Sequence, residues 1–225
     1  MKQMVTFNRM FMPVATIPST YPIGELDKEI GIYSATPERV YKDGGPVARS
    51  FIEQIPAKFF TKAKELGLHI ICDIRLHRLN VGEFPSVPGW HCDGDVRKSY
   101  AAQPELERPQ GDHIICCVSS HPEGVSNFEF VTEDVTCELD NEHPTLGVYA
   151  QLHNYVEANS LQRVPSHDGV LYWMNSETIH RPRQAKVRGW RMFMRATMYH
   201  HGCIEADGKF SKQEQVYILT EANGW

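Results

Sequence analysis

Apolar and polar residues alternate along several segments in the middle of the chain, and this period of two predicts β-strands. In residues 68–79, LHIICDIRLHRL, a strand with one buried face is predicted, because Ile70, Cys72, Ile74 and Leu76 alternate with polar residues. Further strands are predicted at residues 113–120, 126–131, 145–156, 168–176 and 190–201. Turn-forming Pro, Gly, Asn and Asp residues separate these strands.

A single helix is predicted at residues 56–67, PAKFFTKAKELG, immediately before the first strand. Pro56 suits the first helical position and Gly67 suits the end of the helix. The apolar residues of this segment recur at helical spacing, and they are Phe59, Phe60, Ala63 and Leu66. Residues 1–55 contain many Pro and Gly residues with only short apolar pieces between them, which predicts an irregular lead-in.

One helix followed by many strands at short intervals predicts a mainly β (α+β) fold, an antiparallel double sheet of the jelly-roll kind with a flanking N-terminal helix. The sequence contains no internal repeat, low-complexity tract or linker that divides it. We therefore expect one domain over residues 1–225, with an irregular and helical flank over 1–67, a jelly-roll core over 68–201 and a C-terminal extension over 202–225.

The composition is that of a folded globular protein, with 41% hydrophobic and 23% charged residues among 225. The formal net charge of −5 provides no general attraction for a polyanion, which argues against nucleic acid as a partner. No apolar run approaches the roughly 20 residues that span a bilayer, and Asn8, Arg9 and Pro13 interrupt the N-terminal segment. We therefore expect a cytoplasmic protein with no membrane partner.

The cysteines predict neither a disulfide framework nor a zinc site. They are Cys72, Cys92, Cys116, Cys117, Cys137 and Cys203. No two of them form a C-x-x-C motif, and the adjacent pair in a β-like run suits buried free thiols. The spacing also argues against thiolate ligation of zinc.

Metal-binding chemistry is suggested by PGWHCDGD, residues 88–95, which contains a His-x-Asp pair. Residues two apart on a strand share a face, so His91 and Asp93 can direct an imidazole and a carboxylate to one point. The alternative is a polar turn in which neither side chain is a ligand. A second pair, His121 and Glu123, has a proline between its members, and we interpret it as a solvated loop.

His180 is the candidate for a third metal ligand, from a distant part of the chain. It follows the apolar segment 168–176, at the end of which a side chain can turn back into the mouth of a barrel. Two histidines and one carboxylate with open positions form the facial arrangement of non-heme Fe(II) oxygenases. The alternative interpretation of His180 is a surface or capping histidine.

Two arginines share one face of the last predicted strand. In WRMFMRATMY the even positions are apolar, whereas Arg191 and Arg195 lie on the opposite face. That face is either solvent-exposed or the interior of a barrel, where a buried guanidinium needs an anionic partner. A bound dicarboxylate meets this need, because guanidinium and carboxylate groups pair bidentately.

The order of these motifs resembles that of the Fe(II)/2-oxoglutarate-dependent oxygenases. WHCD at residues 90–93, then His180 in IHRP, then Arg191 eleven residues later, is similar to the family's His-x-Asp, distant His and later Arg. PGWHCD resembles the phytanoyl-CoA hydroxylase branch, and the second arginine, Arg195, resembles that of the taurine dioxygenase branch. The resemblance covers about residues 68–200.

The resemblance implies a double-stranded β-helix, the cupin-like jelly-roll barrel, in which His91, Asp93 and His180 bind Fe(II). It implies that Arg191 binds the far carboxylate of 2-oxoglutarate and that Arg195 helps to position this co-substrate or the substrate. The implied activity is a dioxygenase that uses O2 to convert 2-oxoglutarate to succinate and CO2 while hydroxylating a substrate. Because halogenating relatives have a small residue in place of the carboxylate, Asp93 favours hydroxylation. No catalytic residue is assigned beyond the metal ligands.

The expected substrate is a small molecule, with a protein side chain as the alternative. Two other functions are also consistent with the residues. A non-catalytic jelly-roll protein can bind an anion or a carbohydrate on its arginine face, and its histidines are then incidental. A cupin-type dioxygenase or isomerase uses a metal without 2-oxoglutarate, and Arg191→Ala then leaves its activity intact.

Overall fold

The computed structural model describes residues 2–18, 21, 23–93, 111–121, 124–125, 127–140, 142–143, 145–200, 209–211 and 216–218. Its strands are β1 (Lys2–Phe7), β2 (Phe11–Thr16), β3 (Gly31–Ala35), β4 (Leu68–Leu79), β5 (Asp112–Ser119), β6 (Phe128–Val131), β7 (Val135–Asp140), β8 (Arg163–Pro165), β9 (Val170–Asn175), β10 (His180–Pro182), β11 (Gly189–His200) and β12 (Lys209–Ser211). Its helices are α1 (Ile23–Leu26), α2 (Pro37–Asp43), α3 (Pro46–Gln54), α4 (Ala57–Glu65) and α5 (Val148–Ala158). No helix in these ranges is both long and apolar enough to cross a membrane.

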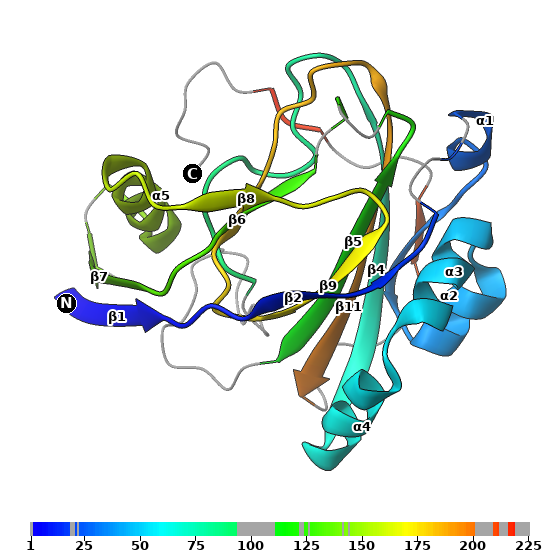
Figure 1. The fold of residues 1–225 in the computed structure, drawn as a ribbon, viewed down its shortest axis with the longest axis horizontal. Helices are drawn as coiled ribbons and strands as arrows, with labels where there is room; N and C mark the ends of the chain where they lie inside the picture. The colour runs from blue at the N-terminus through cyan, green and yellow to red at the C-terminus, as the bar shows by residue number, and fades with distance from the viewer. Residues whose placement is uncertain are drawn as a thin grey trace.

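The strands pair in antiparallel sheets. A seven-stranded sheet has the order β12-β3-β4-β11-β5-β9-β2, a three-stranded sheet has the order β10-β6-β8, and β1 pairs with β7. Figure 1 shows α2, α3 and α4 on one side of the large sheet and the three-stranded sheet on its other side. The prediction of a mainly β fold with antiparallel sheets and few helices is confirmed. The jelly-roll arrangement stays a prediction.

Strand β11 lies between β4 and β5 in the large sheet and separates two interiors. On its apolar face, Met192, Met194 and Met198 are fully buried. They belong to one core cluster with Phe51 of α3 and Phe59 of α4. Each large apolar side chain buried in this way contributes about 1.5–3 kcal/mol, so this core fixes the orientation of β11.

A second core joins the large sheet to the three-stranded sheet. Phe193 of β11 lies against Phe128 of β6, with ring centroids 5.4 Å apart. Phe130 of β6 lies against Tyr172 of β9, also with centroids 5.4 Å apart. Because Phe193 shares its face of β11 with the two arginines, that face is an interior and not a solvent-exposed surface.

The predicted helix and most predicted strands are present. Strands β4, β5, β6, β9 and β11 lie at the predicted segments, and α4 lies at the predicted helix. Pro56 is the N-cap of α4, one position before the first helical residue. Gly67 has a φ of +66°, a left-handed conformation that glycine adopts without strain, and it turns the chain into β4.

The irregular lead-in predicted for residues 1–55 is wrong. This segment contributes strands β1, β2 and β3 and helices α1, α2 and α3. Pro37 and Pro46 each lie at the start of a helix, where the missing N–H costs no hydrogen bond. Thr36 caps α2 by accepting a hydrogen bond from the Arg39 N–H. These prolines mark where helices begin, and not where the chain loops.

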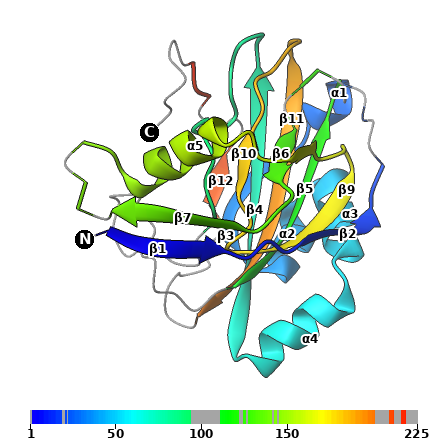
Figure 2. The same cartoon turned by 60° about the vertical axis from the view of Figure 1, so that its left-hand side comes forward.

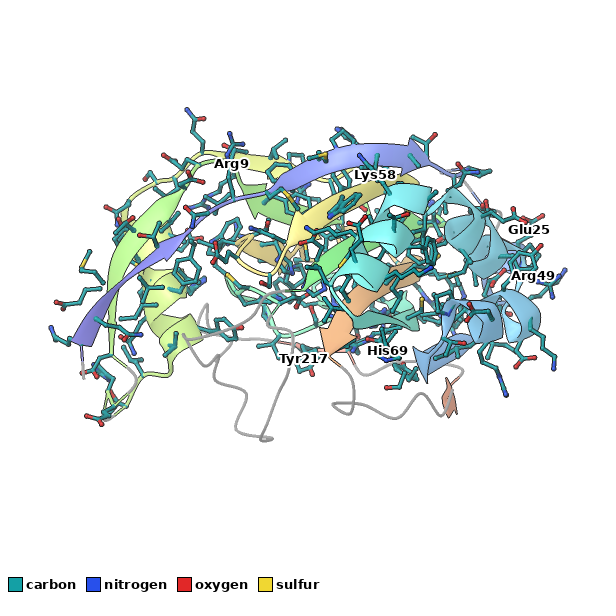
Figure 3. All side chains as sticks on the ribbon, turned by 90° about the horizontal axis from the view of Figure 1, so that it is seen from below. Arg9, Glu25, Arg49, Lys58, His69 and Tyr217 are labelled. Atoms are coloured by element: carbon teal, nitrogen blue, oxygen red, sulfur yellow. The ribbon has the colours of Figure 1, made fainter. Side chains whose placement is uncertain are left out.

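The strand predicted at residues 145–156 is wrong as well, because most of this segment forms α5. Val148, Leu152 and Val156 lie four residues apart, so they share one face of a helix, and all three are buried. A short apolar run of this kind does not distinguish a strand from a helix. Figure 2 shows α5 beside β7, and Figure 3 shows Arg49 at the opposite end of the molecule from β1.

The cysteines are buried and free wherever the structure describes them, as their spacing predicts. They are Cys72, Cys92, Cys116, Cys117 and Cys137. Burial raises the pKa of Cys137 to about 11, which keeps it protonated near neutral pH. Cys203 and most of the predicted C-terminal extension lie outside the described residues.

Candidate metal centre

His91 and His180 are paired through their backbones. The His91 N–H donates to the His180 carbonyl (3.0 Å), and the His180 N–H donates to the His91 carbonyl (2.9 Å). Their imidazole ring centroids are 4.5 Å apart. His180 is the first residue of β10, so the three-stranded sheet fixes one histidine, and the backbone pairing places the other beside it.

Both imidazoles are held by backbone carbonyls through the same ring nitrogen. Nδ1 of His91 lies 2.9 Å from the Gly89 carbonyl, and Nδ1 of His180 lies 2.9 Å from the Thr178 carbonyl. A carbonyl only accepts, so each Nδ1 carries the proton and each Nε2 is the unprotonated nitrogen of a neutral ring. Histidines that bind metals are oriented by hydrogen bonds of this kind.

The loop that carries the His-x-Asp pair is not a regular strand, which differs from the prediction. His91 forms a single bridge with His180, and the two residues that follow it have no strand pairing. Gly89, with a φ of +146°, turns the chain just before the pair, in a conformation that residues with a Cβ rarely adopt. The two side chains converge on one point because this loop is held in place, and not because of strand alternation.

Asp93 completes a group of three candidate ligands. Its Oδ2 lies 3.8 Å from His180 Nε2, and one ligand atom from each of His91, Asp93 and His180 lies within 4.8 Å of the others. Ligand atoms that each lie about 2.1 Å from one ion are roughly 3–4 Å apart, so small side-chain rotations close the set. Two imidazoles and a carboxylate are a donor set that suits iron and related divalent metals. These residues can therefore hold a metal ion.

Arg195 joins the carboxylate of Asp93 to a second carboxylate. Its Nη1 donates to Asp93 Oδ2 (2.9 Å), and its Nη2 donates to Asp73 Oδ2 (2.8 Å). Asp73 lies directly opposite Arg195 in the pairing of β4 with β11. Burial alone would raise the pKa of Asp93, but the Arg195 guanidinium and the nearby histidines outweigh it and hold the pKa well below its usual range. Asp93 is therefore ionised, as a metal ligand must be.

His113 of β5 holds the backbone of Asp93 by a hydrogen bond. Its Nε2 donates to the Asp93 carbonyl (3.1 Å), and its Nδ1 lies 2.9 Å from the Thr197 hydroxyl. Burial lowers the pKa of His113 to about 4, so the ring is neutral and Nδ1 accepts from Thr197. The backbone of Asp93 is thus anchored to the large sheet.

Arg191 is buried farther along the same face of β11 and is 2% exposed. Its guanidinium carbon lies 5.2 Å from the Phe128 ring centroid and 5.4 Å from that of Phe193. Nη1 lies 3.5 Å from Nδ1 of His77. Burial, followed by the charge of Arg191, lowers the pKa of His77 well below its usual range, so His77 is a neutral acceptor. A guanidinium in this interior can pair with a carboxylate that enters it.

Asp168 lies close enough to Arg191 to interact with its charge. The Ser119 hydroxyl donates to Asp168 Oδ2, while Oδ1 is buried with no hydrogen-bond partner in the described part of the chain. Burial raises the pKa of Asp168 to about 6, although the Ser119 hydrogen bond and the Arg191 charge both act to lower it. Asp168 is mainly ionised at pH 7.5, but at a cost to stability.

This raised pKa predicts a specific dependence of stability on pH. The stability that Asp168 contributes is fully present below its unfolded pKa of about 4 and is lost as pH rises through about 6. In Asp168→Asn the side chain does not titrate. Urea unfolding should show the wild type losing on the order of 3 kcal/mol relative to this variant between pH 4 and pH 7.5. Parallel pH profiles for the two proteins would contradict the assignment.

The five site residues chosen from the sequence lie in one interior, but in two groups. His91, Asp93 and His180 form the cluster and Arg195 contacts it, whereas Arg191 contacts His77 and two aromatic rings instead. Of the competing pair, His121 lies exposed in a turn, and Glu123 lies outside the described residues.

Several contacts of the site were not predicted from the sequence. Asp73 was recognisable as an acidic residue on the polar face of a predicted strand, but its partner Arg195 follows only from strand register. His113 was a polar residue at the head of an apolar strand, which indicates a buried and hydrogen-bonded side chain. Tyr149 and His153 of α5 contact the backbones of Cys92 and Trp90, and these contacts could not be found because that segment was predicted as a strand.

Comparisons with known proteins add little to this geometry. No protein-family model and no curated protein sequence matches the chain. A crystal structure of a protein named EvdMO1 is similar with a TM-score of 0.36 and 15% sequence identity, over 71% of this chain and 34% of that chain. The chain therefore spans about a third of the length of that protein. At this TM-score and identity, the likeness supports no conclusion about fold or function.

Proposed function

We propose that this protein is an Fe(II)- and 2-oxoglutarate-dependent dioxygenase that hydroxylates a small-molecule substrate. One observation carries the proposal: His91 and His180 are paired by their backbones, with both Nδ1 atoms held by carbonyls, beside the ionised carboxylate of Asp93. The opposed large and three-stranded sheets also support the jelly-roll arrangement that belongs to this proposal.

Nε2 of His91, Nε2 of His180 and one carboxylate oxygen of Asp93 would hold the metal. Three protein ligands leave coordination positions open, as a catalytic site requires. When bound, Fe(II) with 2-oxoglutarate and O2 supplies an oxidising reaction in which one oxygen atom enters succinate, the other enters the substrate, and CO2 is released. Asp93 would also neutralise part of the metal charge, and the hydrogen bond from Arg195 restrains the rotation of its carboxylate.

Arg191 binds the far carboxylate of 2-oxoglutarate in this proposal. Its guanidinium lies between aromatic rings, where the attraction between a guanidinium and a carboxylate is stronger than in water. Arg195 already contacts Asp93 and Asp73, so its main role is to orient Asp93. Its Nε is buried with no hydrogen-bond partner among the described residues.

The proposal is tested by measuring succinate from protein loaded anaerobically with Fe(II), after 2-oxoglutarate and O2 are added. Succinate should form even without an identified substrate, and omission of any one of the three components should stop it. Anaerobic calorimetry should also detect 2-oxoglutarate binding to the Mn(II) form. A metal-loaded protein that neither binds 2-oxoglutarate nor forms succinate would favour a non-catalytic binding protein.

A further inference from the structure

Helix α5 contacts the residues on both sides of His91, namely Trp90 and Cys92. Tyr149, His153 and Glu157 lie four residues apart and therefore share one face of the helix. The Tyr149 hydroxyl donates to the Cys92 carbonyl, and His153 Nδ1 accepts from the Trp90 N–H (3.3 Å). Glu157 Oε1 accepts from the Trp90 indole Nε1 (2.7 Å). The residues before and after His91 are thus both held by α5.

Glu157 also contacts the segment of the second histidine. Arg181, which directly follows His180, donates from Nη1 to Glu157 Oε1 (2.8 Å). The same carboxylate oxygen therefore contacts Trp90, next to His91, and Arg181, next to His180. The two segments meet here, because the Arg181 guanidinium carbon lies 4.3 Å from the Trp90 ring centroid.

The other contacts of this group restrict its movement. The Trp90 side chain is completely buried, and Arg181 is also held by Glu129 of β6 through two nitrogens at 2.9 and 2.8 Å. Arg163 of β8 lies 5.2 Å from the Trp90 ring centroid and pairs with Glu157 at 3.3 Å. Together these contacts resist a change in the separation of the two histidine segments.

We propose that Glu157 is a positioning residue that reinforces the pairing of the His91 and His180 segments through Trp90 and Arg181. This role rests on the proposed function, because it concerns the metal that these histidines would hold. A preorganised site binds its ion without the entropy cost of ordering its ligands. Loss of a residue that orients the ligands typically lowers metal affinity 10–100-fold. Without Glu157, the Trp90 indole N–H loses its acceptor, and Glu129 remains as the carboxylate partner of Arg181.

Glu157 combines an exposed carboxylate with a buried partner. Its side chain is 40% exposed, so its ion pairs contribute little to stability, but the Trp90 indole N–H is buried and loses its acceptor without Glu157. Some loss of stability is therefore expected for either role. A positioning role also changes the Co(II) spectrum of the bound ion, whereas a merely structural role lowers stability and leaves that spectrum unchanged.

The test compares Glu157→Ala and Glu157→Gln by anaerobic Co(II) calorimetry, Co(II) visible absorption and urea unfolding without metal. Glu157→Ala should weaken Co(II) binding by about 10-fold and change the absorption spectrum, since the spectrum reports ligand geometry.

Glu157→Gln should recover most of the affinity, because its amide oxygen still accepts from Trp90. Trp90→Phe, which keeps an aromatic ring but removes the indole N–H, should weaken binding in the same direction. Glu138→Ala, which removes an exposed carboxylate paired with Lys2, should leave the affinity and the spectrum unchanged.

Wild-type affinity and an unchanged spectrum in Glu157→Ala would overturn the role of Glu157, and so would a loss of affinity equal to that in Glu138→Ala. The proposed function fails separately. If the wild type binds Co(II) and His180→Ala does not, the metal centre stands whatever Glu157→Ala shows. If the wild type binds no Co(II), the metal centre and the role of Glu157 are both wrong.

Discussion

Asp93→Ala is expected to weaken Fe(II) or Co(II) binding by more than about 100-fold and to abolish succinate formation. Contacts outside a ligand set can be worth 10–100-fold in affinity, so the loss of a ligand itself must exceed that range. Asp93 is the single carboxylate of the described His-Asp-His cluster, so its removal also leaves the metal charge without an anionic ligand. Anaerobic titration with Co(II), followed by the succinate assay, measures both effects.

Asp73→Asn is the matched control for this variant. Asp73 pairs with the same guanidinium, Arg195, but lies outside the cluster, so its removal should lower metal affinity far less than the loss of Asp93. Asp93→Asn shows how much of the loss in metal affinity comes from charge, because it keeps the side-chain size and an acceptor for Arg195 while it removes the negative charge. Wild-type Co(II) affinity in Asp93→Ala would exclude Asp93 as a ligand.

Arg191→Met is expected to weaken 2-oxoglutarate binding by roughly 100-fold while it leaves Co(II) affinity almost unchanged. Hydrogen bonds to charged groups are worth about 1.5–3 kcal/mol, and each 1.4 kcal/mol is tenfold, so loss of the guanidinium produces an effect of this size. Arg191 does not contact the metal cluster through any described hydrogen bond or ion pair, so the metal and co-substrate affinities should separate. Calorimetry with the Mn(II) form under anaerobic conditions measures both constants.

Two further variants keep this result interpretable. Arg188→Met removes an exposed arginine just before the same strand and should bind 2-oxoglutarate as the wild type does. Removal of a buried charge also leaves Asp168 without its neighbour, so Arg191→Met is repeated in an Asp168→Asn background, where no carboxylate is left uncompensated. Unchanged 2-oxoglutarate affinity in both backgrounds would favour a metal enzyme that does not use this co-substrate.

The sequence predicted the large sheet better than the rest of the fold. Strands β4 and β11 are twelve residues each, and most of their length alternates between apolar and polar residues, so their period of two is evident. The segment of α5 contains a short apolar run that fits either a strand or a helix, and packing against β7 decides between them. The prolines at the starts of α2 and α3 were also ambiguous, because proline marks both turns and first helical positions.

In the candidate site, too, some residues were predictable from the sequence and others were not. His91, Asp93 and His180 were recognisable because a metal needs particular side-chain types, and those types stand out in any sequence. The pairing of Arg195 with Asp73 depends on the register of two strands far apart in the chain. The contacts of Glu157 with Trp90 and Arg181 depend on where a helix docks. Contacts of this kind are set by tertiary packing and leave no periodic pattern in the sequence.

The most direct test of this account is diffraction from crystals grown anaerobically with Mn(II) and measured at the manganese absorption edge. We expect an anomalous peak bonded to Nε2 of His91, Nε2 of His180 and one carboxylate oxygen of Asp93. A manganese-saturated crystal with no peak between these three atoms, or with the ion held by other side chains, would contradict the account.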